Sequence, residues 1–262
     1  MKVVLTIAGS DSSGGAGIQA DLKTFEAFGV FGTTAITVLT AQNTMGVQNI
    51  VPMETSFIKS QIESIFEDFD VAAIKIGMLF NKEIIEMVAD VIKDVKVPIV
   101  LDPVSISKAG SPLLEESAIE AMSSLFEHVT LITPNAHEAY AFFDYNYEDR
   151  KSMQKIQNSQ TPVLVKHHVA ELAEGKFSVD KLYFRKEARV FQTPLIETNN
   201  LHGTGCSFSS AITANLALGY TLEQSIRKSK QFISEALKSA PSIGNGPGPI
   251  NHKTGGEHVE YA

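Results

Sequence analysis

The residues that most clearly suggest chemistry are His202-Gly203-Thr204-Gly205-Cys206, at the predicted start of a helix. Glycine lets the backbone approach a ligand closely. The free N–H groups and the dipole of a helix N-terminus favour an anion, such as a phosphoryl group in transfer. The same field would lower the pKa of the Cys206 thiol. A plain glycine-rich turn with a buried cysteine also explains this segment, and from these residues alone it is slightly favoured.

Several familiar catalytic motifs are absent from the sequence. No Gly-x-x-x-x-Gly-Lys-Ser/Thr segment occurs, and the glycines of the loop at 9–17 do not match the Gly-x-Gly-x-x-Gly of dinucleotide-binding proteins. Neither the His-Glu-x-x-His of zinc proteases nor the Gly-x-Ser-x-Gly of serine hydrolases is present. The sequence therefore supports none of these classes.

The composition is that of an ordinary globular protein, with 262 residues of which 44% are apolar. The 22 Lys and Arg against 30 Asp and Glu give a formal net charge of −8. This charge argues against broad binding of nucleic acid or anionic membranes. The single cysteine, Cys206, excludes an internal disulfide and favours a reducing, cytoplasmic setting. No apolar run approaches the roughly 18 residues of a membrane span.

Short apolar runs alternate with amphipathic segments along the chain. Strands are predicted at 3–7, 33–40, 72–76, 98–101, 131–132 and 162–165, a hairpin at 182–191, and helices at 18–25, 58–66, 84–92, 205–219 and 221–237. The alternation predicts one α/β domain over 1–262, with a mostly parallel sheet covered on both faces and a surface tail over about 253–262. Ligands bind at the carboxyl ends of such strands, and the polar, glycine-rich segments fall there: 9–17, 41–44, 77–78, 102–110, 133–138 and 201–206.

Seven ordered motifs cover most of the chain: AGSDSSGGAGIQADLKTF (8–25), LTAQNT (39–44), KIGML (75–79), LDPV (101–104), TPN (133–135) followed by Glu138-Ala139, HGTGC (202–206) and GPGPINH (246–252). On these motifs the chain resembles the hydroxymethylpyrimidine/phosphomethylpyrimidine kinases of thiamine synthesis, within the ribokinase-like superfamily. The resemblance implies a three-layer α/β/α sandwich and a homodimer. Pyridoxal kinases look similar, but the segment 42–44 and the closing motif favour the pyrimidine branch.

The resemblance implies phosphorylation by ATP of the hydroxymethyl group of 4-amino-5-hydroxymethyl-2-methylpyrimidine, and then of the monophosphate. Mg²⁺ is the implied metal, and a monovalent cation is a further candidate. The implied site residues are Gly9, Asp21, Gln42, Met78 and Val104 for the substrate, Asn135, Lys166 and Thr204 for the nucleotide, Glu138 and Asp102 for the metal, and Gly203, Gly205 and Cys206 for catalysis. A carboxylate and an amide suit the amino donor and ring-nitrogen acceptors of the aminopyrimidine. Without the resemblance, Asp21 is typical of a solvated helix residue and Glu138 of a carboxylate that opposes a helix dipole.

Cys206 occupies the position at which many sugar kinases of the superfamily have a catalytic Asp. The first phosphorylation must deprotonate an alcohol, whereas the acceptor of the second is already an anionic phosphate oxygen. We therefore expect Cys206 to serve as a base for the first step, and its loss to harm that step more than the second. General base catalysis supplies about 10²–10⁴-fold.

Two departures from the family pattern bear on function. Ser105 follows Asp-Pro-Val where the family usually has Met, and Lys166-His167-His168 replaces Lys-Gly-Gly-His. Without its glycines the second loop should be crowded where it approaches ATP, which predicts weaker nucleotide binding. Adjacent residues on a strand point to opposite faces, so the two histidines are not expected to share a metal. The alternatives are pyridoxal kinase and a weakly active, pyrimidine-binding regulatory relative, which the altered loop motivates.

Overall fold

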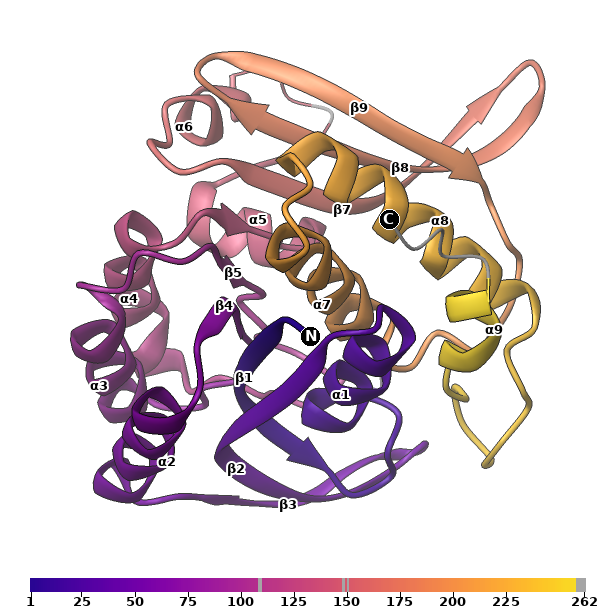
Figure 1. The fold of residues 1–262 in the computed structure, drawn as a ribbon. Helices are drawn as coiled ribbons and strands as arrows, with labels where there is room; N and C mark the ends of the chain where they lie inside the picture. The colour runs from indigo at the N-terminus through magenta and orange to yellow at the C-terminus, as the bar shows by residue number, and fades with distance from the viewer. Residues whose placement is uncertain (108–109, 148, 150, 258–262) are drawn as a thin grey trace.

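The computed structural model describes residues 1–107, 110–147, 149 and 151–257. Within them nine strands form one sheet, with helices on both faces (Figure 1). The strands are β1 Val3–Asp11, β2 Phe31–Asn43, β3 Gly46–Pro52, β4 Val71–Ile76, β5 Ile99–Leu101, β6 Leu131–Ile132, β7 Val163–Leu172, β8 Gly175–Phe184 and β9 Glu187–Pro194. The helices are α1 Gly17–Ala27, α2 Thr55–Asp68, α3 Lys82–Ile92, α4 Ile119–Met122, α5 Ala136–Phe143, α6 Met153–Gln157, α7 Thr204–Ala217, α8 Leu222–Lys238 and α9 His252–Glu257, with 3₁₀ turns at Glu116–Ala118 and Ser123–His128. The predicted α/β class is confirmed.

The sheet has the order β3-β2-β1-β4-β5-β6-β7-β8-β9. Strands β2 to β7 in this order are parallel, whereas β3 at one edge and β8 and β9 at the other are antiparallel to their neighbours. The central strands β4 and β5 are almost completely buried, as expected for a parallel sheet covered on both faces. The sequence predicted the parallel centre and the β8–β9 hairpin but missed β3 and the extension of β7 and β8.

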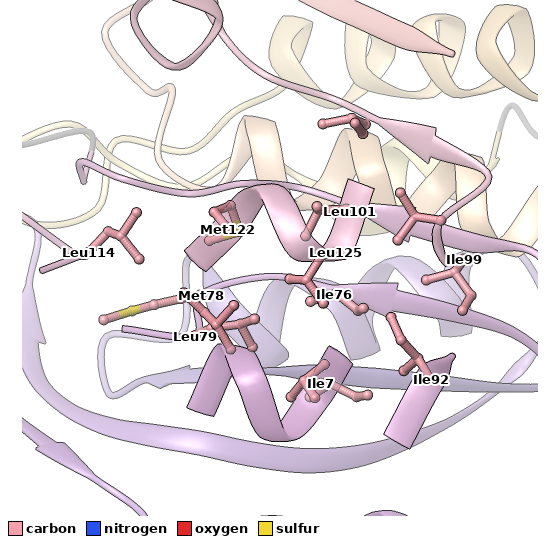
Figure 2. Close-up of a cluster of buried hydrophobic side chains, with 14 of the residues drawn as sticks. Ile7, Ile76, Met78, Leu79, Ile92, Ile99, Leu101, Leu114, Met122 and Leu125 are labelled. Atoms are coloured by element: carbon pink, nitrogen blue, oxygen red, sulfur yellow. The ribbon is translucent and has the colours of Figure 1, made fainter. Parts of the chain in front are cut away.

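Two helical layers enclose the apolar core. On one face α2, α3 and α4 cover the largest cluster, and Figure 2 shows part of it, with Ile76 and Leu101 of the sheet facing Ile92 of α3 and Leu125. On the other face α1, α7 and α8 bury two smaller clusters. Across the described part of the chain, no helix has the length and apolarity needed to cross a lipid bilayer.

The expected surface tail is instead a packed helix over its first residues. Helix α9 packs on α1 and α8, and both of its glycines are buried. A Cβ atom on Gly255 would lie 2.8 Å from the Phe232 ring, and one on Gly256 would lie 2.9 Å from Ala27. These glycines therefore permit close packing of α9 against α1 and α8. A glycine-rich composition is compatible with either a packed helix or a flexible tail, so the composition alone did not predict α9. Residues 258–262 lie outside the described residues.

Candidate active site

A cavity of about 560 Å³ opens where the parallel strands end. Residues that follow β1, β4, β5 and β6 line it, together with β7 and the start of α7. All of the predicted site residues except Asp21 line this cavity: Gly9, Gln42, Met78, Val104, Asp102, Asn135, Glu138, Lys166, Gly203, Thr204, Gly205 and Cys206. The fold thus brings together motifs that are separated by up to about 200 residues in the sequence.

Asp21 lies beneath the cavity and does not line it, contrary to its predicted role as a substrate ligand. Its carboxylate is fully buried and accepts hydrogen bonds from Lys75 Nζ (2.9 Å), Thr6 Oγ1 (2.7 Å) and Ser210 Oγ (2.6 Å). Lys75 does line the cavity. Burial opposes the charge of Lys75, but the Asp21 carboxylate together with Cys206 and Asp102 outweighs burial and raises the pKa of Lys75. The cavity wall therefore carries a fixed cation at Lys75, which was not among the predicted site residues.

Lys166 and Asp102 form a buried ion pair at the centre of the cavity, with a 2.6 Å distance between Nζ and Oδ1. Ser209 Oγ of α7 donates to the other oxygen of Asp102 at 3.2 Å. Burial alone would lower the pKa of Lys166, but the Asp102 and Glu138 carboxylates raise it. Lys166 is therefore cationic at neutral pH and lies beside the start of α7.

Asn135 and Glu138 form the capping box of α5. Asn135 Oδ1 accepts from the Glu138 N–H at 2.9 Å, and Glu138 Oε2 accepts from the Asn135 N–H at 2.8 Å. The Ser105 N–H donates to Glu138 Oε1 at 3.3 Å. Burial is the main reason that the pKa of Glu138 rises to about 7; Lys166 lowers it in part, while Asp102 raises it. The helix-terminal interpretation of Glu138 is thus correct, and the same carboxylate also faces the cavity.

The start of α7 is a glycine turn whose backbone N–H groups could accept an anion. Gly203 is the N-cap and has a left-handed backbone (φ 80°), which favours glycine. A Cβ atom on Gly203 would overlap the carbonyl oxygen of Gly15. One on Gly205 would lie 3.4 Å from Lys166 Nζ. The first N–H groups of a helix have no partner inside it, so those of Gly205 and Cys206 are available beside Lys166.

The thiol of Cys206 is not activated in the way the helix field suggested. Burial raises its pKa to about 11; Lys75 lowers the pKa in part, whereas Asp21 and Asp102 raise it. The N–H of Gly17 donates to the sulfur, which favours the thiolate only weakly. The thiol is therefore neutral at pH 7, because the cost of burying its charge exceeds the effect of the helix dipole.

Asp11, at the end of β1, lines one side of the cavity and was also not among the predicted site residues. Its Oδ2 accepts from His202 Nε2 (2.8 Å) and the Ala16 N–H (2.8 Å), and its Oδ1 accepts from Ser13 Oγ (2.7 Å). Burial opposes ionisation, but these hydrogen bonds lower the pKa of Asp11 to about 2. The pair of Asp11 and His202 therefore connects the end of β1 to the turn that precedes α7. Gln42 lies at the rim of this side, where its Oε1 accepts from Thr40 Oγ1 at 3.2 Å.

The other side of the cavity lies between β7–β9 and α8, and no motif predicted it. Apolar side chains line much of it: Phe208, Leu195, Ile196, Ile233 and Leu237. Among them lies a third buried lysine–aspartate pair, with 2.6 Å between Lys230 Nζ and Asp180 Oδ2. Asp180 comes from β8 and Lys230 from α8, so the pair connects a hairpin strand to the helical layer.

The two histidines of the altered loop separate as predicted. His167 lines the cavity, whereas His168 does not and stacks on Tyr147 with 3.3 Å between ring centroids. At the position of the first missing glycine, His167 adopts a left-handed backbone (φ 60°) such as a glycine would take. The register of β7 against β8 shifts between Val165 and His168, which accommodates the bend.

Comparisons with known proteins show the family and the fold of this chain. The profile of the family described as Phosphomethylpyrimidine kinase matches residues 11–251. The chain is 45% identical over 260 residues to a hydroxymethylpyrimidine/phosphomethylpyrimidine kinase of Haemophilus influenzae, covering 96% of this chain and 97% of that protein. It is similar to an ADP complex of Bacillus subtilis pyridoxal kinase (TM-score 0.84, 34% identity, 97% and 98% of the two chains). It is also similar to a phosphomethylpyrimidine kinase structure from Clostridium difficile (TM-score 0.74, 38% identity, 90% and 100%).

Proposed function

The chain belongs to the phosphomethylpyrimidine kinase family, and we propose that its cavity holds an aminopyrimidine at the Asp11 side and ATP at the Lys230 side. It is a kinase of thiamine synthesis that phosphorylates hydroxymethylpyrimidine and then its monophosphate. The observation that carries the proposed arrangement is the central meeting of Lys166 with the glycine turn of α7. Cations and free N–H groups converge there, between a polar and a largely apolar side.

The substrate side suits 4-amino-5-hydroxymethyl-2-methylpyrimidine. Gln42 offers both an amide donor and a carbonyl acceptor to the amino group and ring nitrogens. Gly9 leaves room for the ring, because a Cβ atom there would lie 2.7 Å from Val38 and 3.2 Å from the sulfur of Met78. Asp21 acts from below by fixing Lys75 rather than by touching the substrate.

Phosphoryl transfer depends mainly on positioning and charge stabilisation. Lys166 and the N–H groups of Gly205 and Cys206 receive the charge of the transferring group. In the first step the small thiolate fraction of Cys206 takes the proton of the hydroxymethyl group and becomes the thiol, while the alkoxide oxygen forms the bond to the transferring phosphorus. The second acceptor is already anionic and needs no base, so a neutral thiol there avoids the repulsion that a carboxylate would exert.

The residues present fit Mg²⁺. Glu138 and Asp102 offer carboxylate oxygens at the cavity wall, and Ser105 Oγ is buried with no hydrogen-bond partner among the described residues. Mg²⁺ prefers such oxygen ligands and usually keeps several waters and substrate phosphates, so one or two side chains suffice. When bound, the ion would neutralise charge on the phosphates. Asn135 would orient Glu138 through the capping box.

The direct test is product analysis by mass spectrometry. Purified protein is incubated with Mg·ATP and either hydroxymethylpyrimidine or pyridoxal, with Lys166→Met as the inactive control. We expect the monophosphate and then the diphosphate of the pyrimidine, and little pyridoxal phosphate. Phosphorylation of pyridoxal alone would refute the substrate assignment. Pyrimidine binding without any product would refute catalysis and indicate a regulatory relative.

A further inference from the structure

His167 has a backbone conformation that its residue type disfavours. It lies within β7, yet its φ is 60°, a region in which a side chain with a Cβ atom is strained. Glycine would adopt this conformation at no cost. Non-glycine residues of this kind gather at functional sites, where the surrounding structure holds them.

The surrounding contacts hold this bend, and His167 lines the cavity. The N–H of His167 donates to Asp180 Oδ1 at 2.8 Å, and Asp180 is itself fixed by Lys230. His167 Nδ1 lies 3.4 Å from Ser178 Oγ of the neighbouring strand. Because of the bend, Lys166 and His167 both line the cavity, although adjacent residues of a regular strand face opposite sides.

The position of His167 along the cavity indicates what it would contact. Its chain neighbour is Lys166, which we place at the transfer centre, and its contact Ser178 pairs with Thr193 on the side that we assign to the nucleotide. The phosphate chain of a nucleotide must pass between these two parts. We propose that the imidazole of His167 donates a hydrogen bond to this phosphate chain, with Asp180 as the residue that positions it. The inference rests on the proposed function, because it assumes that ATP occupies this side.

The test compares two glycine substitutions. His167→Gly removes the imidazole and relieves the left-handed strain. Lys186→Gly is the matched control, since Lys186 is left-handed as well (φ 66°) but is exposed in the β8–β9 turn and does not line the cavity. Both variants should melt higher by roughly 2 °C, because both lose the same backbone strain.

Binding is measured by calorimetry with Mg·ADP and, separately, with adenosine. We expect His167→Gly to weaken Mg·ADP binding about tenfold, the effect of one lost hydrogen bond to a charged group, while adenosine and hydroxymethylpyrimidine bind as before. Lys186→Gly should leave the affinities for Mg·ADP, adenosine and hydroxymethylpyrimidine unchanged. His167→Asn should recover part of the loss, because asparagine tolerates the left-handed region and keeps an N–H donor.

An unchanged affinity for Mg·ADP in His167→Gly, or an equal loss of adenosine affinity, would overturn the inference. Failure of the proposed function has a different signature. A wild-type protein that binds Mg·ADP through His167 but phosphorylates no pyrimidine would retain this inference and lose the proposed function.

Discussion

The two sides of the cavity each contain a buried lysine–aspartate pair, but the pairs differ in their surroundings. Lys75 lies on β4 and Asp21 on α1, and both side chains are fully buried. The Asp21 carboxylate also accepts hydrogen bonds from the hydroxyl groups of Thr6 and Ser210. Lys230–Asp180 joins α8 to the antiparallel β8, and both of its residues line the cavity. One pair is part of the interior of the parallel sheet, whereas the other borders the space that we assign to ATP.

This difference shows how one fold can support a fixed substrate side and an adjustable nucleotide side. The substrate side is built from central strands and from the α7 turn, where small displacements would disturb the core. The nucleotide side is built from a hairpin that extends beyond the parallel sheet (Figure 1). We therefore expect substitutions around Lys75 and Asp21 to affect stability and chemistry together. Substitutions around Lys230 and Asp180 should mainly affect nucleotide binding.

The largest effect is expected for Asp21→Asn. It leaves the Lys75 ammonium buried without its counter-charge, which costs about 3–5 kcal/mol of unfolding free energy. Urea denaturation measures the loss. The double variant Asp21→Leu with Lys75→Met should recover much of it, since an apolar pair of similar volume replaces two charges. If Asp21→Asn kept wild-type stability and abolished pyrimidine binding, Asp21 would be a substrate ligand after all.

Gly203→Ala should reduce kcat by about 10²–10³-fold, the effect of losing an anion-binding donor. The added methyl group overlaps the carbonyl of Gly15 and forces the turn out of place. Gly219→Ala is the matched control, because Gly219 is also left-handed (φ 90°) but a Cβ atom there meets nothing within 4 Å. That control should lose only about 1 kcal/mol of stability and keep its kcat. Equal kcat values for the two variants would argue against an anion site at α7.

Lys230→Met should raise the KM for ATP about tenfold, because it frees Asp180 from its cation and loosens the His167 bend. Its stability should fall by only about 2 kcal/mol, less than for an enclosed pair, since the cavity lets water reach the carboxylate. Steady-state kinetics with each substrate varied separately provides the measurement. A fall in kcat with an unchanged KM for ATP would place this pair in the chemical step and remove the contrast between the two sides.

The sequence predicted the residues at the ends of the parallel strands better than those of the β8–β9 hairpin and α8, for a physical reason. Apolar runs and the glycine turns at 9–17 and 203–205 specify local structure, and parallel topology brings strand ends together, so the motifs predicted most of the residues that line this part of the cavity. Lys230 and Asp180 lie 50 residues apart on an amphipathic helix and a hairpin strand, and nothing local distinguishes them from surface charges. Asp21 was misplaced for the converse reason, because only the structure shows that Lys75 and Ser210 consume both of its oxygens.

Cys206→Ala should give the smallest effect, about a tenfold loss in kcat for the first phosphorylation and little change in the second. A base supplies more when its pKa is near the working pH, and burial holds this thiol at about 11. Because folding raises the pKa, the thiol stays protonated through neutral pH, and its small thiolate fraction grows about tenfold with each pH unit. The first-step kcat of the wild type should therefore rise between pH 7 and 9, whereas that of Cys206→Ala should not. Both steps can be followed separately by starting from hydroxymethylpyrimidine or its monophosphate. Equal losses in the two steps would show that Cys206 only shapes the α7 turn, and the α7 N–H groups and Lys166 would then account for the chemistry alone.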